Sequence, residues 1–95
     1  MADAVHIVDD DATYLSWLDA NCEGWVVNTR KRIDPGYFVL HRADCNSIRM
    51  RDDTLPGAFT ERGYSKIVAG TMEALQEFME TRGIGAFSKR CSQCN

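Results

Sequence analysis

Four side chains in two short segments have the types and spacing of a metal site. His41 and Cys45 are separated by three residues, and Cys91 and Cys94 by two. One imidazole and three thiolates suit four-coordinate Zn²⁺, which structural sites hold with Cys and His ligands. A Cys-x-x-Cys pair alone also fits a redox pair, but a second pair at short spacing favours metal. The sequence therefore predicts a structural zinc site formed by His41, Cys45, Cys91 and Cys94.

The expected role of this ion is to hold two parts of the chain together. A zinc ion with four protein ligands has no vacant position for a substrate. The two pairs are 45 residues apart, counted between Cys45 and Cys91, and closing so long a loop is entropically costly. Metal binding of about 10–16 kcal/mol, typical of zinc-finger peptides, would offset that cost. The basic neighbours Arg42, Lys89 and Arg90 would reduce the negative charge of three thiolates.

Other chemistries fit these residues less well. A zinc deaminase needs His-x-Glu before a Cys-x-x-Cys pair, and Ala43 stands where the Glu would be. Cys22 would give an all-cysteine site without His41, but no second ligand lies within two to four residues of it. We therefore expect Cys22 to be a thiol that does not bind metal, and we expect no catalytic residue.

Basic residues in the middle of the chain form a second candidate site. The formal net charge is −3, which argues against a strongly basic protein that binds nucleic acid by counterion release. The charge is uneven, however, and a local basic face is compatible with an acidic chain. The residues that we expect to contact nucleic acid are Arg30, Lys31, Arg32, Arg42 and Arg49. The alternative, exposed charge without a ligand, stays open.

Local patterns predict the elements that position both sites. Apolar residues at spacings of three and four predict helices over 11–22 and 72–82, with Thr71 as an N-cap of the second. Runs of β-branched and aromatic residues predict strands over 25–30, 37–41 and 64–69. Asp34-Pro35-Gly36 is typical of a turn and predicts a hairpin between the first two strands. We expect one zinc-binding α+β domain over residues 1–95, with a small antiparallel sheet and two helices packed on it.

The same sequence predicts a cytoplasmic location. No apolar run approaches the roughly 18 residues that a membrane span requires. The first residues, Met1 to Ala4, lack the basic and apolar regions of a signal peptide. Thiols remain reduced in the cytosol, which favours cysteines as zinc ligands over disulfides.

The C-terminal part of the sequence carries a longer motif. It consists of Tyr37 and Phe38, His41-Arg42-Ala43-Asp44-Cys45, Glu73-Ala74-Leu75, Gly83 and Arg90-Cys91-Ser92-Gln93-Cys94-Asn95. Over residues 36–95 this pattern resembles the small Ada-like metal-binding modules. The resemblance implies that the matching His and Cys positions bind structural zinc and that the module works beside nucleases or other DNA-handling proteins. The segment 49–63 is longer than in those modules, and the whole chain also looks like a class of small bacterial proteins.

These observations predict a non-enzymatic, zinc-stabilised module that binds nucleic acid or a DNA-processing partner. One alternative is a protein–protein adaptor with an exposed apolar face. Another is a thiolate enzyme of alkyl-transfer repair. In the Ada repair domain all four ligands are cysteines and one accepts a methyl group from DNA phosphate. His41 departs from that set, so the acceptor here would be Cys45, Cys91 or Cys94.

Overall fold

The computed structural model describes residues 4–45, 60 and 63–90. This part of the chain forms a five-stranded sheet and two helices, which confirms the expected α+β class. The elements in chain order are β1 (Val5–Ile7), α1 (Asp11–Ala20), β2 (Trp25–Arg30), β3 (Phe38–Arg42), β4 (Tyr64–Ala69), α3 (Met72–Thr81) and β5 (Lys89–Arg90). The predicted limits of β2 and β4 are confirmed, and those of the other three predicted elements differ by at most two residues.

The sheet is mixed, so the prediction of a purely antiparallel sheet is wrong at one edge. The strand order is β1-β4-β2-β3-β5, and only β5 runs parallel to its neighbour β3. β5 contains two residues and β1 contains three. Strands this short show no recognisable alternation of apolar and polar residues, because that pattern needs about four residues. Their pairing therefore had no local sequence signal.

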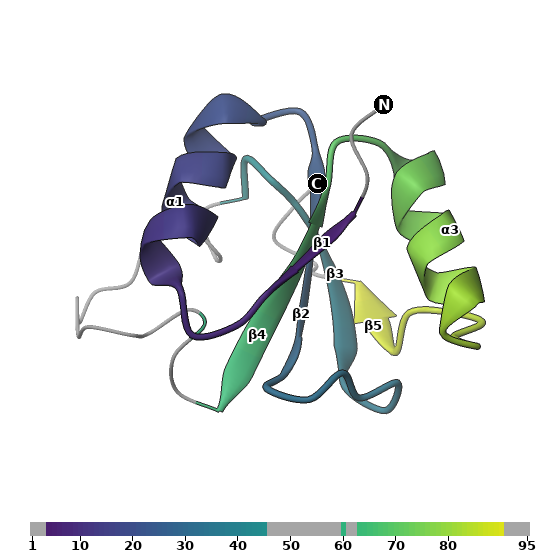
Figure 1. Ribbon diagram of the computed structural model, residues 1–95. Helices are drawn as coiled ribbons and strands as arrows, with labels where there is room; N and C mark the ends of the chain where they lie inside the picture. The colour runs from purple at the N-terminus through teal and green to yellow at the C-terminus, as the bar shows by residue number, and fades with distance from the viewer. Residues whose placement is uncertain (1–3, 46–59, 61–62, 91–95) are drawn as a thin grey trace.

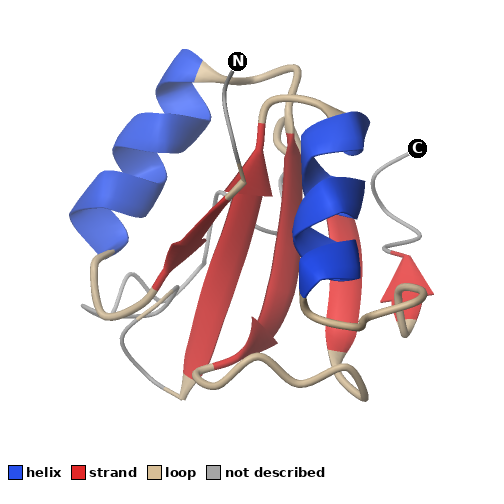
Figure 2. Cartoon of the chain, turned by 45° about the vertical axis from the view of Figure 1, so that its right-hand side comes forward, coloured by secondary structure: helices blue, strands red, loops and turns tan. Residues whose placement is uncertain are grey.

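The two helices cover opposite faces of the sheet, as Figures 1 and 2 show. β2 lies at the centre and pairs with β3 and β4, and successive side chains of a strand point to alternate faces. Val26 therefore faces α1 and Val27 faces α3. The core on the α1 side is Ile7, Tyr14, Leu18, Val26, Ala43, Cys45 and Val68. The core on the α3 side is Val27, Phe38, Leu40, Ile67, Ala69, Leu75, Met79 and Ile84.

Side-chain hydrogen bonds fix the starts of both helices. The Asp10 carboxylate accepts from the Thr13 backbone N–H at 3.1 Å, and the Thr71 hydroxyl accepts from the Ala74 N–H at 3.1 Å. Each bond satisfies one of the N–H groups that a helix start leaves without an intrahelical partner. Neither helix of the described part of the chain has the length and apolar character needed to cross a bilayer.

The predicted hairpin between β2 and β3 is confirmed. The Asp34 carboxylate accepts from the Gly36 N–H at 2.8 Å, and the Tyr37 N–H donates to the Asp34 carbonyl at 3.0 Å. Asp and Pro favour this turn for two reasons. The Asp side chain can hydrogen-bond the backbone N–H two residues further on, and the proline ring fixes its own φ at a value that the turn requires. The turn returns the chain as β3 and so delivers His41.

The entry to β2 is tightly packed, which gives a test of the arrangement. A Cβ at Gly24 would lie 2.7 Å from the Ala69 carbonyl oxygen and 2.8 Å from the Trp17 ring. Because the carbonyl is backbone, Gly24→Ala should lower the free energy of unfolding by about 1–3 kcal/mol, measured by denaturant unfolding. Gly85→Ala is the matched control, since nothing lies within 4 Å of its Cβ position. Equal stability of the two variants would contradict this packing.

Candidate functional site

The first predicted half-site, His41 and Cys45, lies where β3 ends. His41 pairs with Val26, so its side chain points to the α1 face. A turn follows, in which the Cys45 N–H donates to the Arg42 carbonyl at 3.0 Å. Cys45 belongs to the same buried cluster as Val26. His41 and Cys45 are only 8% and 5% exposed, so strand and turn bring both donors to one face beneath α1.

The structure also brings Cys45 next to another sulfur. Cys45 is disulfide-bonded, whereas Cys22 is exposed and free. The partner of Cys45 lies outside the described residues. A disulfide and a zinc site both require cysteine sulfurs to converge, but a sulfur bonded to another sulfur is not a thiolate ligand. Cys45 can therefore bind zinc only after its disulfide is reduced.

The second predicted half-site, Cys91 and Cys94, lies outside the described residues. The chain up to Arg90 is described, however, and β5 places Arg90 beside Leu40 in a parallel pairing with β3. The peptide that leads to Cys91 therefore starts beside the strand that carries His41. In the described part of the chain, no three His, Cys, Asp or Glu side chains form a metal-binding group.

Lys66 is a buried cation that the sequence analysis did not select. It is 2% exposed, its Nζ donates to the Asn28 amide oxygen at 2.8 Å, and it lies 5.6 Å from the centre of the Tyr14 ring. Lys66 lies in β4 and pairs with Asn28 of β2, whose side chain faces α1, so Lys66 also faces α1. The alternation of Tyr64, Lys66 and Val68 was the available signal, since it put a lysine on the same face as Val68.

His41 is held in its neutral form. Burial, and then the positive charge of Lys66, lower the pKa of His41 to about 4. A neutral imidazole is the form that binds metal, so no proton has to be displaced from this ring at neutral pH. His6, the other histidine, is half-buried, and its Nε2 is hydrogen-bonded to the Ser65 hydroxyl at 2.7 Å.

Three of the five predicted nucleic-acid contacts lie together. Arg30 ends β2, and Lys31 and Arg32 follow it at the exposed tip of the β2–β3 hairpin. Arg30 pairs with Asp34 at 3.2 Å and Lys31 with Asp9 at 3.0 Å. All four side chains are at least 41% exposed, and ion pairs between exposed side chains contribute little to the stability of the fold. We call Arg30, Lys31 and Arg32 the basic tip.

The structure does not bring Arg42 to the basic tip. Arg42 pairs with Trp25, at the opposite end of β2 from Arg30. Five steps along a strand separate these two ends by roughly 17 Å. Arg42 and Trp25 also face α3, whereas Arg30 faces α1, and Arg42 contacts Asp44 at 3.5 Å. Arg49 lies outside the described residues.

Two tyrosines beside the basic tip are further candidate residues. Tyr37 and Tyr64 have ring centres 5.7 Å apart, and the Arg30 guanidinium lies 5.1 Å from the centre of the Tyr37 ring. Neither tyrosine was selected from the sequence as a site residue. The signal was present in the alternation of each strand, but their proximity depends on the pairing of β4 with β2.

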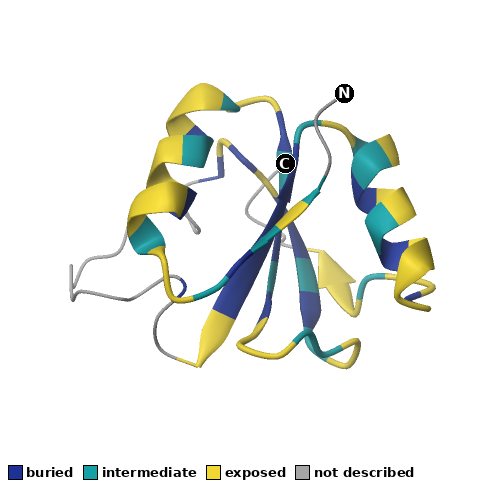
Figure 3. Ribbon diagram, in the orientation of Figure 1, coloured by how far each residue is buried: buried dark blue, intermediate teal, exposed yellow. Residues whose placement is uncertain are grey.

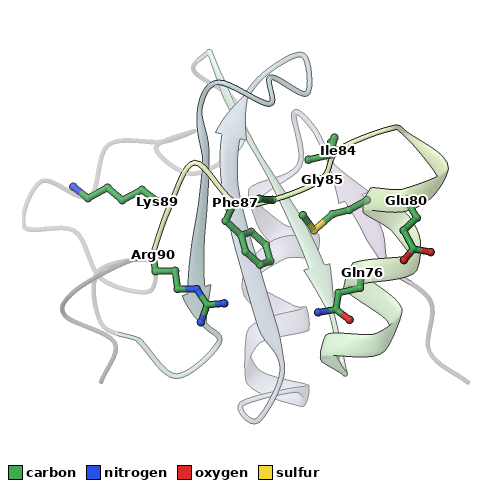
Figure 4. A pocket seen from close by; sticks show the side chains of 9 residues that line it. Gln76, Glu80, Ile84, Gly85, Phe87, Lys89 and Arg90 are labelled. Carbon is green, nitrogen blue, oxygen red and sulfur yellow. The ribbon is translucent and has the colours of Figure 1, made fainter.

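A groove of about 610 Å³ lies on the other side of the sheet, between α3 and the segment that leads into β5. Figure 4 shows Gln76 and Glu80 on α3 and Phe87 and Arg90 on the opposite wall. The floor includes Met79 and Ile84, which belong to the core. The groove therefore combines apolar, acidic and basic groups.

In comparisons with known proteins, no family model matches the chain, and no curated protein or solved structure matches it. The resemblance to Ada-like modules therefore depends on the residues of the motif alone and stays a prediction.

The environment of His41 predicts a pH dependence. Its pKa is below 6.5 in the folded chain, so protonation favours the unfolded chain. With a chelator present, the free energy of unfolding should fall as the pH is lowered from about 6.5 to about 4, by at most about 1.4 kcal/mol per pH unit. NMR titration of the two imidazoles should show a lower midpoint for His41 than for His6. A His41 midpoint at or above 6.5 would contradict its burial beside Lys66.

Proposed function

We propose that this chain is a non-enzymatic, zinc-stabilised module that binds nucleic acid. The zinc ion joins the segment after β5 to the end of β3, through His41, Cys45, Cys91 and Cys94. The basic tip contacts nucleic-acid phosphates. The observation that carries the function is the grouping of three exposed cationic side chains at the tip of one hairpin.

The zinc part of the proposal is supported by the position of β5 beside β3. His41 and Cys45 share the α1 face at the end of β3, and Arg90 lies beside Leu40, the residue before His41. A tetrahedral site requires donors from both segments within a few ångströms of one ion. The neutral imidazole of His41 fits that chemistry, and Cys45 would fit it once its disulfide is reduced.

Lys66 supports the same proposal through charge. A site of one Zn²⁺, three thiolates and one neutral imidazole has a net charge of 2 − 3 = −1. A charge in a weakly polar interior is stabilised by an opposite charge nearby. Lys66 lies close enough to lower the pKa of His41 through its charge. It would therefore balance the excess negative charge of the loaded site.

Metal content tests the zinc proposal. The wild-type chain, purified under reducing conditions, should contain one zinc ion per molecule by elemental analysis. His41→Ala and Cys45→Ser should each lower the zinc content well below that ratio and reduce the melting temperature, because a three-ligand site binds metal less tightly. Cys22→Ser is the matched control and should retain zinc, since Cys22 is exposed and free.

The competing disulfide has its own signature in protein purified without a reductant, because a reductant would cleave the bond. A wild-type chain without zinc, whose intact mass has lost the hydrogens of one cysteine pair and whose peptide map places Cys45 in that pair, would show that Cys45 serves in a disulfide. That result would refute the zinc proposal, whereas full zinc content in both ligand variants would refute the assignment of the ligands.

The nucleic-acid part of the proposal is supported by the exposure of the basic tip. Arg32 has no ion pair with any described residue, and the exposed Lys31–Asp9 pair is readily exchanged for a phosphate contact. Such contacts release counterions from the nucleic acid, and this supplies most of the affinity of non-specific binding. An acidic chain with one basic tip is expected to bind weakly and only at low salt.

Paired variants test the position of this contact. The double variant Lys31→Ala/Arg32→Ala should weaken binding of an oligonucleotide about tenfold at low salt, measured by fluorescence anisotropy. It should also reduce the slope of log affinity against log salt by about 0.7 for each phosphate contact removed from a single strand. Arg42→Ala is the control, because Arg42 lies at the other end of β2 and faces α3.

Two outcomes would contradict different parts of the nucleic-acid proposal. Loss of binding with Arg42→Ala and not with the double variant would refute the assignment to the basic tip. No binding by the wild-type chain at about 50 mM salt would refute the nucleic-acid function, because phosphate contacts are strongest there.

A further inference from the structure

We propose that Tyr37, Arg30 and Tyr64 form a stacking platform for the bases of single-stranded nucleic acid. This inference rests on the proposed nucleic-acid function and specifies the form of its ligand. We call these residues the Tyr–Arg–Tyr row.

The sheet register places the three side chains in one row. Arg30 of β2 is the direct partner of Tyr64 in β4, and Thr29 pairs with Phe38, which puts Tyr37 at the other side of Arg30. Direct partners have their side chains on the same face. The row therefore runs from β4 across β2 to the residue before β3 on the α1 face. The two ring centres lie 5.7 Å apart, and the Arg30 guanidinium lies 5.1 Å from the centre of the Tyr37 ring.

The row lies beyond the part of the sheet that α1 covers. The buried cluster beneath α1 reaches Val26 and Val68 but contains neither tyrosine. Figures 1 and 2 show the hairpin ends of β2, β3 and β4 extending past the helix, and Figure 3 shows the start of β4 as exposed. The Arg30 side chain is 57% exposed and Tyr64 is 37% exposed. Arg30 and Tyr64 are therefore accessible to a ligand, and Tyr37 is partly exposed beside them.

Contacts behind the row hold Tyr37 in place. The Asn28 amide donates to the Tyr37 hydroxyl at 3.4 Å and accepts from the Lys66 ammonium at 2.8 Å. Both residues lie in the next row of the same face. A ring that is held in position before binding loses less conformational entropy on binding. The arrangement thus favours a planar ligand.

The chemistry of the row selects one class of ligand. Bases of single strands stack on aromatic rings and on guanidinium planes, and they do so without sequence preference because every base has a π-face. Bases of a duplex are stacked on one another and are not available to such a platform. Lys31 and Arg32, which follow Arg30 in the chain, supply the positive charge that a phosphate backbone requires.

The test compares single strands with duplexes, using fluorescein-labelled oligothymidine and a duplex of equal length. The wild-type chain should bind the single strand more tightly. Tyr37→Leu and Tyr64→Leu should each weaken that binding between about fivefold and about 150-fold, as expected for one lost stack. Tyr64→Phe should bind more tightly than Tyr64→Leu, because the ring remains. Tyr37→Phe keeps the ring but loses the hydrogen bond from Asn28, so its affinity should lie between those of wild type and Tyr37→Leu.

Phe78→Leu is the control variant. Phe78 also has an arginine over its ring, with Arg82 at 4.5 Å, but it lies on α3 on the other side of the sheet. Its binding should equal that of wild type. A single strand with 2-aminopurine gives a readout on the unmodified protein, since stacking on a tyrosine ring should quench its fluorescence.

The possible results distinguish the stacking platform from the proposed function. Equal affinity for single strand and duplex, with unchanged binding in both leucine variants, would overturn the platform and leave the proposed function intact. Unquenched 2-aminopurine in the wild-type complex would also overturn the platform. Failure of the wild-type chain to bind either nucleic acid would instead overturn the proposed function.

Discussion

The pairing of β2 along both of its edges is the constraint on which the rest of the structure depends. Every residue of β2 has a partner in β4, and five of its six have a partner in β3. Because side chains alternate along a strand, this register decides which residues share a face. A slip by one residue would move Val26, Asn28 and Arg30 to the α3 side and would dismantle both candidate sites.

The α1 face has a gradient from apolar to polar along the strands. At one end Val26 and Val68 pack under α1, and next to them the buried Lys66 forms a hydrogen bond with the half-buried Asn28. Beyond them lies the Tyr–Arg–Tyr row at the exposed end. A buried polar pair is tolerated where its groups are hydrogen-bonded. The same pair joins the environment of His41 to that of Tyr37, so the two candidate sites share one supporting layer.

The parallel edge of the sheet carries the metal hypothesis. A parallel pair needs a crossover connection, and here the path between β3 and β5 includes β4 and α3. β5 is only two residues long, with both side chains exposed. Few hydrogen bonds therefore hold this edge, and a covalent or metal cross-link nearby has the most to add to its stability. The convergence of Cys45 with another sulfur is consistent with either link.

The sequence alone determined the local elements and the spacing within each predicted site. The limits of β2 and β4, the Asp34–Gly36 turn and the N-cap at Thr71 follow from residues close together in the chain. His41 and Cys45 likewise share a face through one turn. Residue types within one strand, one turn or one helix start were enough to specify these features.

Only the tertiary structure decided what depends on strand pairing. It placed the helices on opposite faces, added β1 and the parallel β5, and separated Arg42 from the basic tip. It also brought Tyr37, Arg30 and Tyr64 into one row and buried Lys66 near His41. The physical reason is that the register of strand pairing brings together residues that are far apart in the sequence. Each of those contacts depends on which strands become neighbours, and local spacing carries no information about that choice.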